Sequence, residues 1–205
     1  MLPHEIEEES FRIIRSELGT HGFSPAEEAI VVRMIHATGD FDFRDITRFH
    51  AQAAASGLEA LRRGCAIVTD VRMVEVGIAA DWLAQLGGRL VCDIRHPEVR
   101  QQAQAMGSTR STLAMRRNAA NMAGGIVAVG NAPTALLEVN RLVREEGLRP
   151  ALIIGVPVGF VKAAESKEEL MSLDVPYITT VGRKGGSTVA VAAINALLRL
   201  AAAEQ

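Results

Sequence analysis

The chain has 205 residues, 48% of them hydrophobic but only 4% aromatic, and its formal net charge at pH 7 is -2. Such a composition favours helices packed on parallel strands, and we expect one α/β domain over residues 1–205. The near-neutral charge and the lack of a Lys/Arg run argue against binding to nucleic acid or anionic membranes. An acidic start and no apolar stretch of about 18 residues predict a soluble, cytoplasmic protein.

Two helices are expected at the start of the chain. Apolar residues recur at helical spacing over residues 3–19, with glutamates in the first turns, where they favour the helix dipole. A second helix begins after Ser24, because Ser24, Pro25 and Glu27 have the order of an N-cap, a first helical residue and a capping-box partner. Gly39 is predicted to end this helix.

A strand-helix rhythm follows. After an extended stretch near residues 46–49 and a helix over residues 51–63, five apolar runs alternate with helical segments: 65–69, 89–94, 125–130, 151–155 and 177–182. This rhythm predicts a three-layer α/β/α fold with a mainly parallel five- or six-stranded sheet, which is flavodoxin-like. The last helix, within residues 186–203, is apolar nearly all round and is typical of a core element or a dimer interface.

Glycine-rich turns follow three of the predicted strands, at residues 129–136, 155–160 and 182–188. In a parallel sheet these turns meet at the carboxyl edge, where helix N-termini offer unpaired N–H groups. We therefore expect a ligand with more than one anionic group, and Asn131 and Ser187 are candidate contacts. No turn matches a Walker or dinucleotide-binding signature, so a nucleotide site is not supported.

Three cations are candidates for binding the anionic groups. Arg110 lies in a hydroxyl-rich cluster, and its planar guanidinium suits bidentate binding of a carboxylate. The alternative is a helix N-cap at Ser108 or Thr109 followed by a solvated arginine. Arg183 and Lys184 lie in the glycine turn after the last strand, either facing the ligand or as a solvated pair.

His36 is the candidate for proton transfer. Helical spacing places it between Ala29 and Val32, which predicts at least partial burial, and a buried histidine is more often a hydrogen-bonded core residue than a catalyst. However, the helix C-terminus favours the imidazolium, which could donate a proton at neutral pH. No pair of histidines has metal-ligand spacing and no Ser-His-Asp elbow occurs, so neither a bound metal nor hydrolysis is expected.

The motifs together resemble the precorrin-8X methylmutases (precorrin isomerases) and their cobalt-precorrin-8 counterparts. The motifs that carry the resemblance are "ESFRIIR" (9–15), "RMIHATGDFDF" (33–43), "TDVRMVEVGI" (69–78), "GSTRS" (107–111), "GIVAVGNAPTAL" (125–136), "GVPVGFVKAAESKEEL" (155–170) and "GRKGGS" (182–187). The resemblance implies an isomerase of cobalamin biosynthesis that moves a methyl group from C-11 to C-12 of the macrocycle. It also implies a flavodoxin-like homodimer that needs no cofactor.

In the family the motif histidine is the proton donor or acceptor, which corresponds to His36, and the serine of the first motif contacts substrate, which corresponds to Ser10. Thr38, in the histidine motif, is a further candidate substrate contact. The "DFDF" and "RKGGS" stretches look more like the cobalt-branch enzymes. Lys162 departs from the family pattern, where a small residue is expected, and its role is open.

Two rival functions are compatible with the same residues. A non-catalytic tetrapyrrole carrier or product-sequestering protein would use the same carboxylate-binding groups without rearranging the ring. A regulatory domain of flavodoxin-like type would bind a small molecule instead, and fold analogy is its only support.

Overall fold

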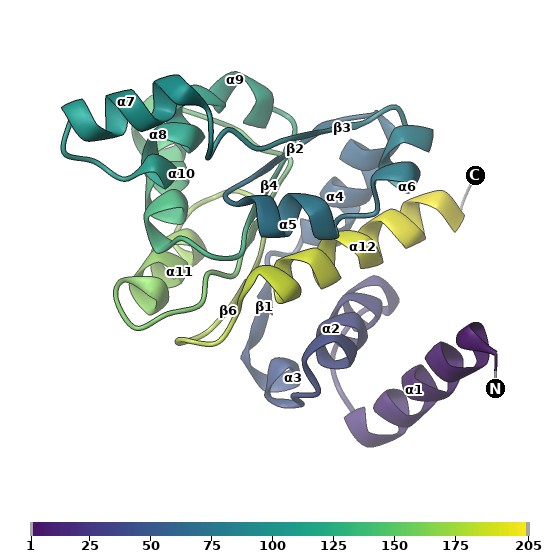
Figure 1. Cartoon of the computed structure of the whole chain (residues 1–205). Coiled ribbons are helices and arrows are strands. Elements are labelled where there is room, and N and C mark those ends of the chain that lie inside the picture. Colours follow the sequence, from purple (N-terminus) through teal and green to yellow (C-terminus); the bar gives the residue numbers. More distant parts are fainter. Residues whose placement is uncertain (1, 204–205) are drawn as a thin grey trace.

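The computed structural model describes residues 2–203, which build a six-stranded sheet with helices on both faces (Figure 1). The strands are β1 (Thr47–Phe49), β2 (Ala66–Thr69), β3 (Arg89–Val91), β4 (Ile126–Val129), β5 (Leu152–Gly155) and β6 (Tyr177–Thr180). Their order across the sheet is β1-β6-β5-β4-β2-β3. Only β1 runs antiparallel, at the edge beside β6. The prediction of a mainly parallel sheet is therefore confirmed.

The five parallel strands have the flavodoxin-like order. Counted along the chain from β2, they lie in the order 2-1-3-4-5 across the sheet. The order reverses between β2 and β4, which is the point of an open α/β sheet where ligands commonly bind. The extended stretch predicted near residues 46–49 is the added edge strand β1.

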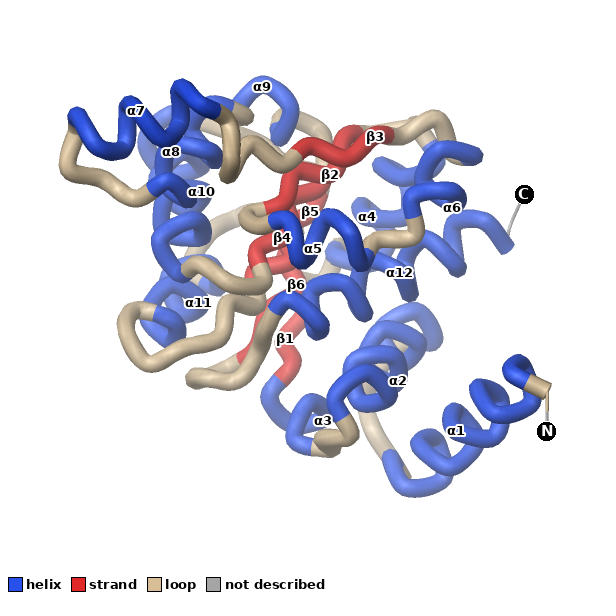
Figure 2. Tube along the Cα trace, in the orientation of Figure 1, coloured by secondary structure: helices blue, strands red, loops and turns tan. Residues whose placement is uncertain are grey.

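The helices fall into two layers (Figure 2). They are α1 (Pro3–Leu18), α2 (Pro25–Thr38), α3 (Asp42–Ile46), α4 (Ala53–Arg62), α5 (Arg72–Gly77), α6 (Ala80–Gln85), α7 (Pro97–Ala105), α8 (Arg110–Arg117), α9 (Ala119–Met122), α10 (Pro133–Glu146), α11 (Ala163–Met171) and α12 (Ser187–Ala203). One layer contains α2, α4, α5, α6 and α12, with α1 outermost against α2. The other contains α8, α9, α10 and α11, with α7 against α8.

The start of α2 follows the predicted local chemistry. The Glu27 N–H donates to the Ser24 hydroxyl over 3.4 Å, and the Ser24 N–H donates to the Glu27 carboxylate over 2.8 Å. This reciprocal pair is the capping box that the sequence predicts. One helix was not predicted: the polar segment after Gly39 forms α3.

The apolar helix α12 is a core element. Ten of its residues are buried, and it packs against α2, α4 and α5 over the sheet. Its polar Asn195 is satisfied, because the side-chain oxygen accepts the Ala79 N–H over 2.9 Å and the side-chain nitrogen donates to the Gly77 carbonyl over 3.0 Å. Within residues 2–203, none of the helices combines the length and the hydrophobicity that a membrane span requires.

Candidate active site

His36 lies in the last turn of α2, which Gly39 ends in the left-handed conformation at φ 64°. The side chain of His36 is exposed, so the expectation of partial burial is wrong. The reason is that Ile35 is the last buried residue of α2, and the helix continues past the core. The imidazole instead lies against Phe11 of α1, with 5.0 Å between ring centroids. His36 is thus accessible to a ligand and held from one side.

A groove of about 590 Å³ adjoins Phe11, between α1, α2 and α12. Phe11, Val32 and Leu200 contribute apolar surface to its lining. Four arginines from the three helices also line it: Arg12, Arg15, Arg33 and Arg199. The groove therefore combines apolar surface with cations, as a large ligand with several carboxylates requires.

Each groove arginine already has a carboxylate partner. Arg33 and Arg199 pair with Glu7, Arg12 pairs with Glu9 at 2.6 Å, and Arg15 pairs with Glu28 at 3.1 Å. The hydrogen bond from Arg33 holds the pKa of Glu7 below its usual value. Arg33 also lies over the Phe11 ring, 5.1 Å from its centroid. The pairs of Glu9 and Glu28 are exposed, so a carboxylate ligand could replace these glutamates at little cost, whereas the Arg33–Glu7 pair is partly buried.

Two hydroxyl side chains near His36 are bonded to their own helices. Ser10, next to Phe11, is half-buried, and its hydroxyl donates to the Ile6 carbonyl over 2.7 Å. Thr38 is exposed, and its hydroxyl donates to the Met34 carbonyl over 2.8 Å. Both hydroxyls keep an acceptor lone pair that a ligand could use. The predicted substrate contacts at Ser10 and Thr38 stay predictions.

Lys184 joins the end of α2 to the loop between β6 and α12. Its ammonium donates to the carboxylates of Asp40 and Asp42, at 2.6 Å each. These hydrogen bonds raise the pKa of Lys184 and lower that of Asp40. Sequence patterns alone did not indicate this contact, because 144 residues separate Lys184 from Asp40. The predicted role of Lys184 in binding substrate would require it to share an ammonium that two aspartates already bind.

The neighbouring loop residues lie at the carboxyl edge of the sheet, as predicted. Arg183 is exposed, and its guanidinium lies over the ring of Phe160, 5.3 Å from the centroid. Ser187 is the first residue of α12 and is almost fully buried. A Cβ placed on Gly130 would lie 2.7 Å from the Ser187 Cα. The turn after β4 and the start of α12 therefore touch, and Gly130 must remain a glycine for them to do so.

Asp70 binds the turn after β4, which is one of the three glycine turns that the sequence offers for ligand contacts. It follows β2, is completely buried, and accepts the N–H groups of Gly130, Asn131 and Ala132 at 3.1, 2.8 and 2.7 Å. Burial raises the pKa of Asp70, and these three bonds oppose the rise. The N–H groups of the turn after β4 are therefore not unpaired, because the protein's own carboxylate accepts them at the strand-order switch point.

The remaining two candidates flank this filled site. Asn131 donates its backbone N–H to Asp70, but its side chain is exposed. Arg110 begins α8 after the N-cap Thr109, whose hydroxyl accepts the Thr112 N–H and donates to Thr134 of α10. The N-cap that the sequence allowed is thus present, and the exposed Arg110 lies near the start of α10. None of the sequence-predicted site residues lines the arginine groove, and His36 is connected to it only through its ring contact with Phe11.

The sequence-predicted residues form a belt along the carboxyl edge rather than one pocket. His36 and Thr38 lie at one end, Lys184 connects them to the β6–α12 loop, and Asn131 and Arg110 lie at the other end. Sequence reasoning missed the groove arginines, which come from both ends of the chain, and also Phe11 and Asp70. Among residues 2–203 no three His, Cys, Asp or Glu side chains gather as metal ligands would.

The fold defines an α/β protein of flavodoxin-like strand order. Its site has an exposed histidine, His36, in contact with Phe11 of an arginine-lined groove. This arrangement suits proton transfer to a large anionic ligand. The sequence profile described as precorrin-8X methylmutase matches residues 5–200. The chain belongs to this family, whose members are intramolecular methyl-transferring isomerases.

Individual relatives agree with this assignment. The cobalt-precorrin-8 methylmutase of Leptospira interrogans is 47% identical, over 97% of this chain and 94% of the relative. The precorrin-8X methylmutase of Pseudomonas aeruginosa is 42% identical, over 92% of this chain and 91% of the relative. The crystal structure of precorrin-8X methylmutase from Thermus thermophilus superposes with a TM-score of 0.90 at 47% identity, covering 97% of this chain and 98% of that one.

Proposed function

We propose that the protein converts precorrin-8X, or cobalt-precorrin-8, to hydrogenobyrinate or cobyrinate in cobalamin biosynthesis. The reaction is a 1,5-shift of a methyl group from C-11 to C-12 of the macrocycle. The names of the relatives support the substrate class. The observation that carries the proposal is the exposed His36 held against Phe11, beside a groove lined by four arginines.

The groove fits the chemistry of this substrate. A corrin precursor is a broad apolar ring whose edge carries several carboxylates. Apolar residues such as Phe11 and Val32 offer surface to the ring, while the groove arginines can bind peripheral carboxylates in place of Glu7, Glu9 and Glu28. Ser10, Thr38, Arg110, Asn131, Arg183, Lys184 and Ser187 are the proposed further substrate contacts.

His36 is proposed to protonate or hydrogen-bond the macrocycle where electron density gathers as the methyl group moves, and to take the proton back afterwards. General acid–base catalysis of this kind is typically worth about 10² to 10⁴ in rate. The shift is unimolecular, so the remaining acceleration comes from holding the ring in the required geometry. No resident cofactor has a part in this proposal, and cobalt, when present, arrives as part of the substrate.

We also infer that the protein is cytoplasmic and forms one domain over residues 1–205, as its length and composition predict, and that it acts as a homodimer, as the family resemblance implies. Ile6 and Ile13 support a contact between subunits at α1, because both are large apolar side chains of α1 that remain 53% and 42% exposed. A preference for the cobalt-containing substrate is consistent with the "DFDF" and "RKGGS" stretches.

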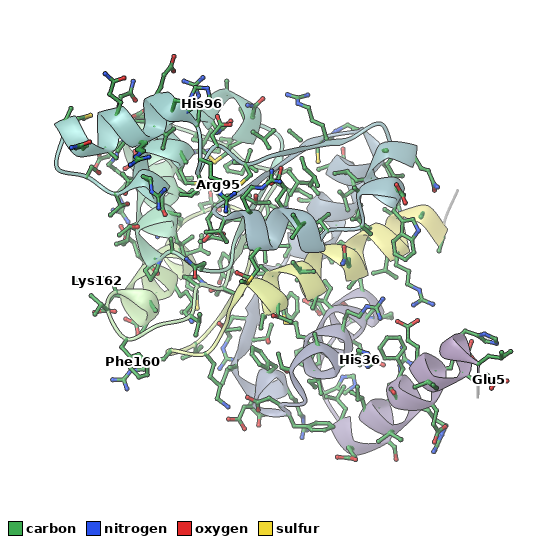
Figure 3. All side chains as sticks on the ribbon, viewed as in Figure 1. Glu5, His36, Arg95, His96, Phe160 and Lys162 are labelled. Carbon is green, nitrogen blue, oxygen red and sulfur yellow. The ribbon has the colours of Figure 1, made fainter. Side chains whose placement is uncertain are left out.

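The test is turnover of purified protein with metal-free and cobalt-loaded precorrin-8, followed by absorbance spectroscopy and product analysis. His36→Asn should lower kcat by about 10² to 10⁴ while substrate still binds. The matched control is His96→Asn, which changes a histidine at the start of α7, in the opposite helix layer, and should keep wild-type turnover (Figure 3). Full turnover by His36→Asn would refute the role of His36.

The same experiment tests the alternative function, that of a non-catalytic tetrapyrrole carrier. It would shift the absorbance spectrum of the bound pigment in a single-turnover mixture without forming rearranged product. Such a result with wild-type protein, for both the metal-free and the cobalt-loaded substrate, would refute the proposed isomerase activity.

A further inference from the structure

Lys167 is a lysine at a core position. The sequence contains three lysines, Lys162, Lys167 and Lys184, and all lie within one short part of the chain. On α11, Lys167 shares the buried face with Ala163, Ser166 and Leu170, and its exposed fraction is 0%. A lysine usually extends its ammonium to water, so full burial at this position needs a physical reason.

The contacts of Lys167 converge on the turn after β6. Its ammonium donates to the Thr180 hydroxyl over 3.1 Å and to the Lys184 carbonyl over 2.8 Å. The Thr180 hydroxyl donates to the same carbonyl over 2.7 Å. Within residues 2–203 no carboxylate lies within ion-pair distance of Lys167, and burial lowers the pKa of its ammonium to about 8. The charge is therefore held by two neutral oxygens.

A contribution to the stability of the fold does not account for the buried ammonium of Lys167. The Lys184 carbonyl would still accept a hydrogen bond from Thr180 if Lys167 were apolar, and the Thr180 hydroxyl would keep its acceptor. An apolar side chain of similar length would avoid the desolvation of an ammonium, so stability alone favours replacement. The benefit of Lys167 must lie in what it does to the turn.

That turn is fixed at both ends. At the far end Gly186 donates its N–H to the Val156 carbonyl over 2.8 Å, and a Cβ on Gly185 would lie 2.2 Å from that carbonyl oxygen. At the near end Lys167 and Thr180 hold the carbonyl of Lys184. The Lys184 side chain leaves the turn at this near end and bonds Asp40 and Asp42, which follow His36 by four and six residues.

We propose that Lys167 is a positioning residue, which fixes the Lys184 carbonyl and so places the Lys184 ammonium where it binds Asp40 and Asp42. Through these bonds the segment after His36 is held against the β6–α12 loop. Lys167 itself touches no ligand. Its effect on the reaction rests on the proposed function of His36, whereas its effect on Lys184 does not.

The direct test is NMR of protein labelled with ¹⁵N at the lysine side chains, recorded without substrate. Three Nζ signals are expected, and that of Lys184 should show slow exchange because two carboxylates bind it. Lys167→Met should move the Lys184 signal to the position and exchange rate of a solvated lysine. The matched control Lys162→Met changes an exposed lysine of the preceding loop and should leave the Lys184 signal in place.

A second variant covers the case in which Lys167→Met does not fold. Thr180→Val removes one hydrogen bond to the Lys184 carbonyl and one acceptor of Lys167, and it should shift the Lys184 signal in the same direction by a smaller amount. If neither variant changes the Lys184 signal, the proposal is overturned.

Kinetics connect this readout to turnover. Lys167→Met should lower kcat/KM by about tenfold to a hundredfold, because small misplacements of binding groups have effects of this size. Most of the change should be in KM, since His36 itself is intact. Unchanged kcat/KM together with a shifted Lys184 signal would overturn the catalytic part alone. An inactive wild type would refute the proposed function and leave the NMR result standing.

Discussion

Lys167 should make the free energy of unfolding depend on pH, and Lys167→Met should remove this contribution. Burial lowers the pKa of its ammonium from 10.5 to about 8. Below pH 8 the folded and unfolded chains both carry the proton, so the cost of burying the charge is fully present. Between pH 8 and 10.5 the folded chain has released the proton and the unfolded chain has kept it. The free energy of unfolding therefore rises with pH across this window.

The size of the effect follows from the two pKa values. A difference of one pH unit corresponds to about 1.4 kcal/mol, so the window from about 8 to 10.5 corresponds to about 3 kcal/mol. The side chain is completely buried, so solvent screening does not reduce this figure as it would for a surface lysine. Lys167→Met lacks the titrating group, so its stability relative to wild type should fall by about 3 kcal/mol as the pH rises from 8 to 10.5.

Urea unfolding followed by circular dichroism at pH 7, 8, 9 and 10 measures the effect. The informative quantity is the difference between wild type and Lys167→Met at each pH, because other titrating groups cancel. Lys162→Met is the control, since Lys162 is 62% exposed, and its difference from wild type should stay constant. Parallel pH curves for wild type and Lys167→Met would show that the buried ammonium does not titrate in this window and would refute the reasoning.

Two further predictions concern hydrogen bonds to backbone N–H groups. Asp70→Ala should lower the free energy of unfolding by about 2 to 4 kcal/mol, because it leaves two buried N–H groups and one partly buried N–H group without their acceptor. Urea unfolding measures this loss, and a loss below about 1 kcal/mol would contradict the structural role. Ser24→Ala should cost about 1 kcal/mol by removing the N-cap of α2, whereas an unchanged urea midpoint would mean that the capping box adds no stability.

Local signals in the sequence predicted the parts of the fold that depend on near neighbours. The capping box of Ser24 and Glu27 and the glycine end at Gly39 need only adjacent residues, and all three are present. The strand-helix rhythm likewise predicted the parallel sheet, because a short connection with a helix leaves few other arrangements. The strand predicted over residues 89–94 ends at Val91, and Asp93 bonds Arg117 and Asn118 instead.

The missed features all depend on contacts between distant residues. Asp70 lies 60 residues from Gly130 in the chain. Nothing in the motif that contains Asp70 or in the motif that contains Gly130 indicates that the Asp70 carboxylate binds the turn at Gly130. The groove arginines come from α1, α2 and α12, so they are adjacent only after folding. The prediction that His36 is partly buried was wrong for a related reason. Helical periodicity gives the direction of a side chain around the axis, but it does not tell where the neighbouring helix stops covering it.

The sequence marks Lys167 as unusual but does not show that its ammonium is buried. Lys167 occupies the same helical phase as Ala163 and Leu170, so a lysine appears where the pattern of α11 requires an apolar residue. The usual interpretation is a long side chain that reaches water, and the sequence offers no evidence against it. Only the position of Thr180 and of the Lys184 carbonyl shows that the ammonium stays inside.

The cations around His36 share one property that bears on how an acidic macrocycle could bind. Arg33 and Lys184 are both paired with carboxylates of the protein, and so are the other groove arginines. These pairs keep the free site close to electrically neutral. Exposed ion pairs are worth only about 0 to 1 kcal/mol, so exchanging Glu9 or Glu28 for a substrate carboxylate would cost little. Affinity must then come from burying the ring and from the shape of the groove, and the arginines mainly fix its orientation.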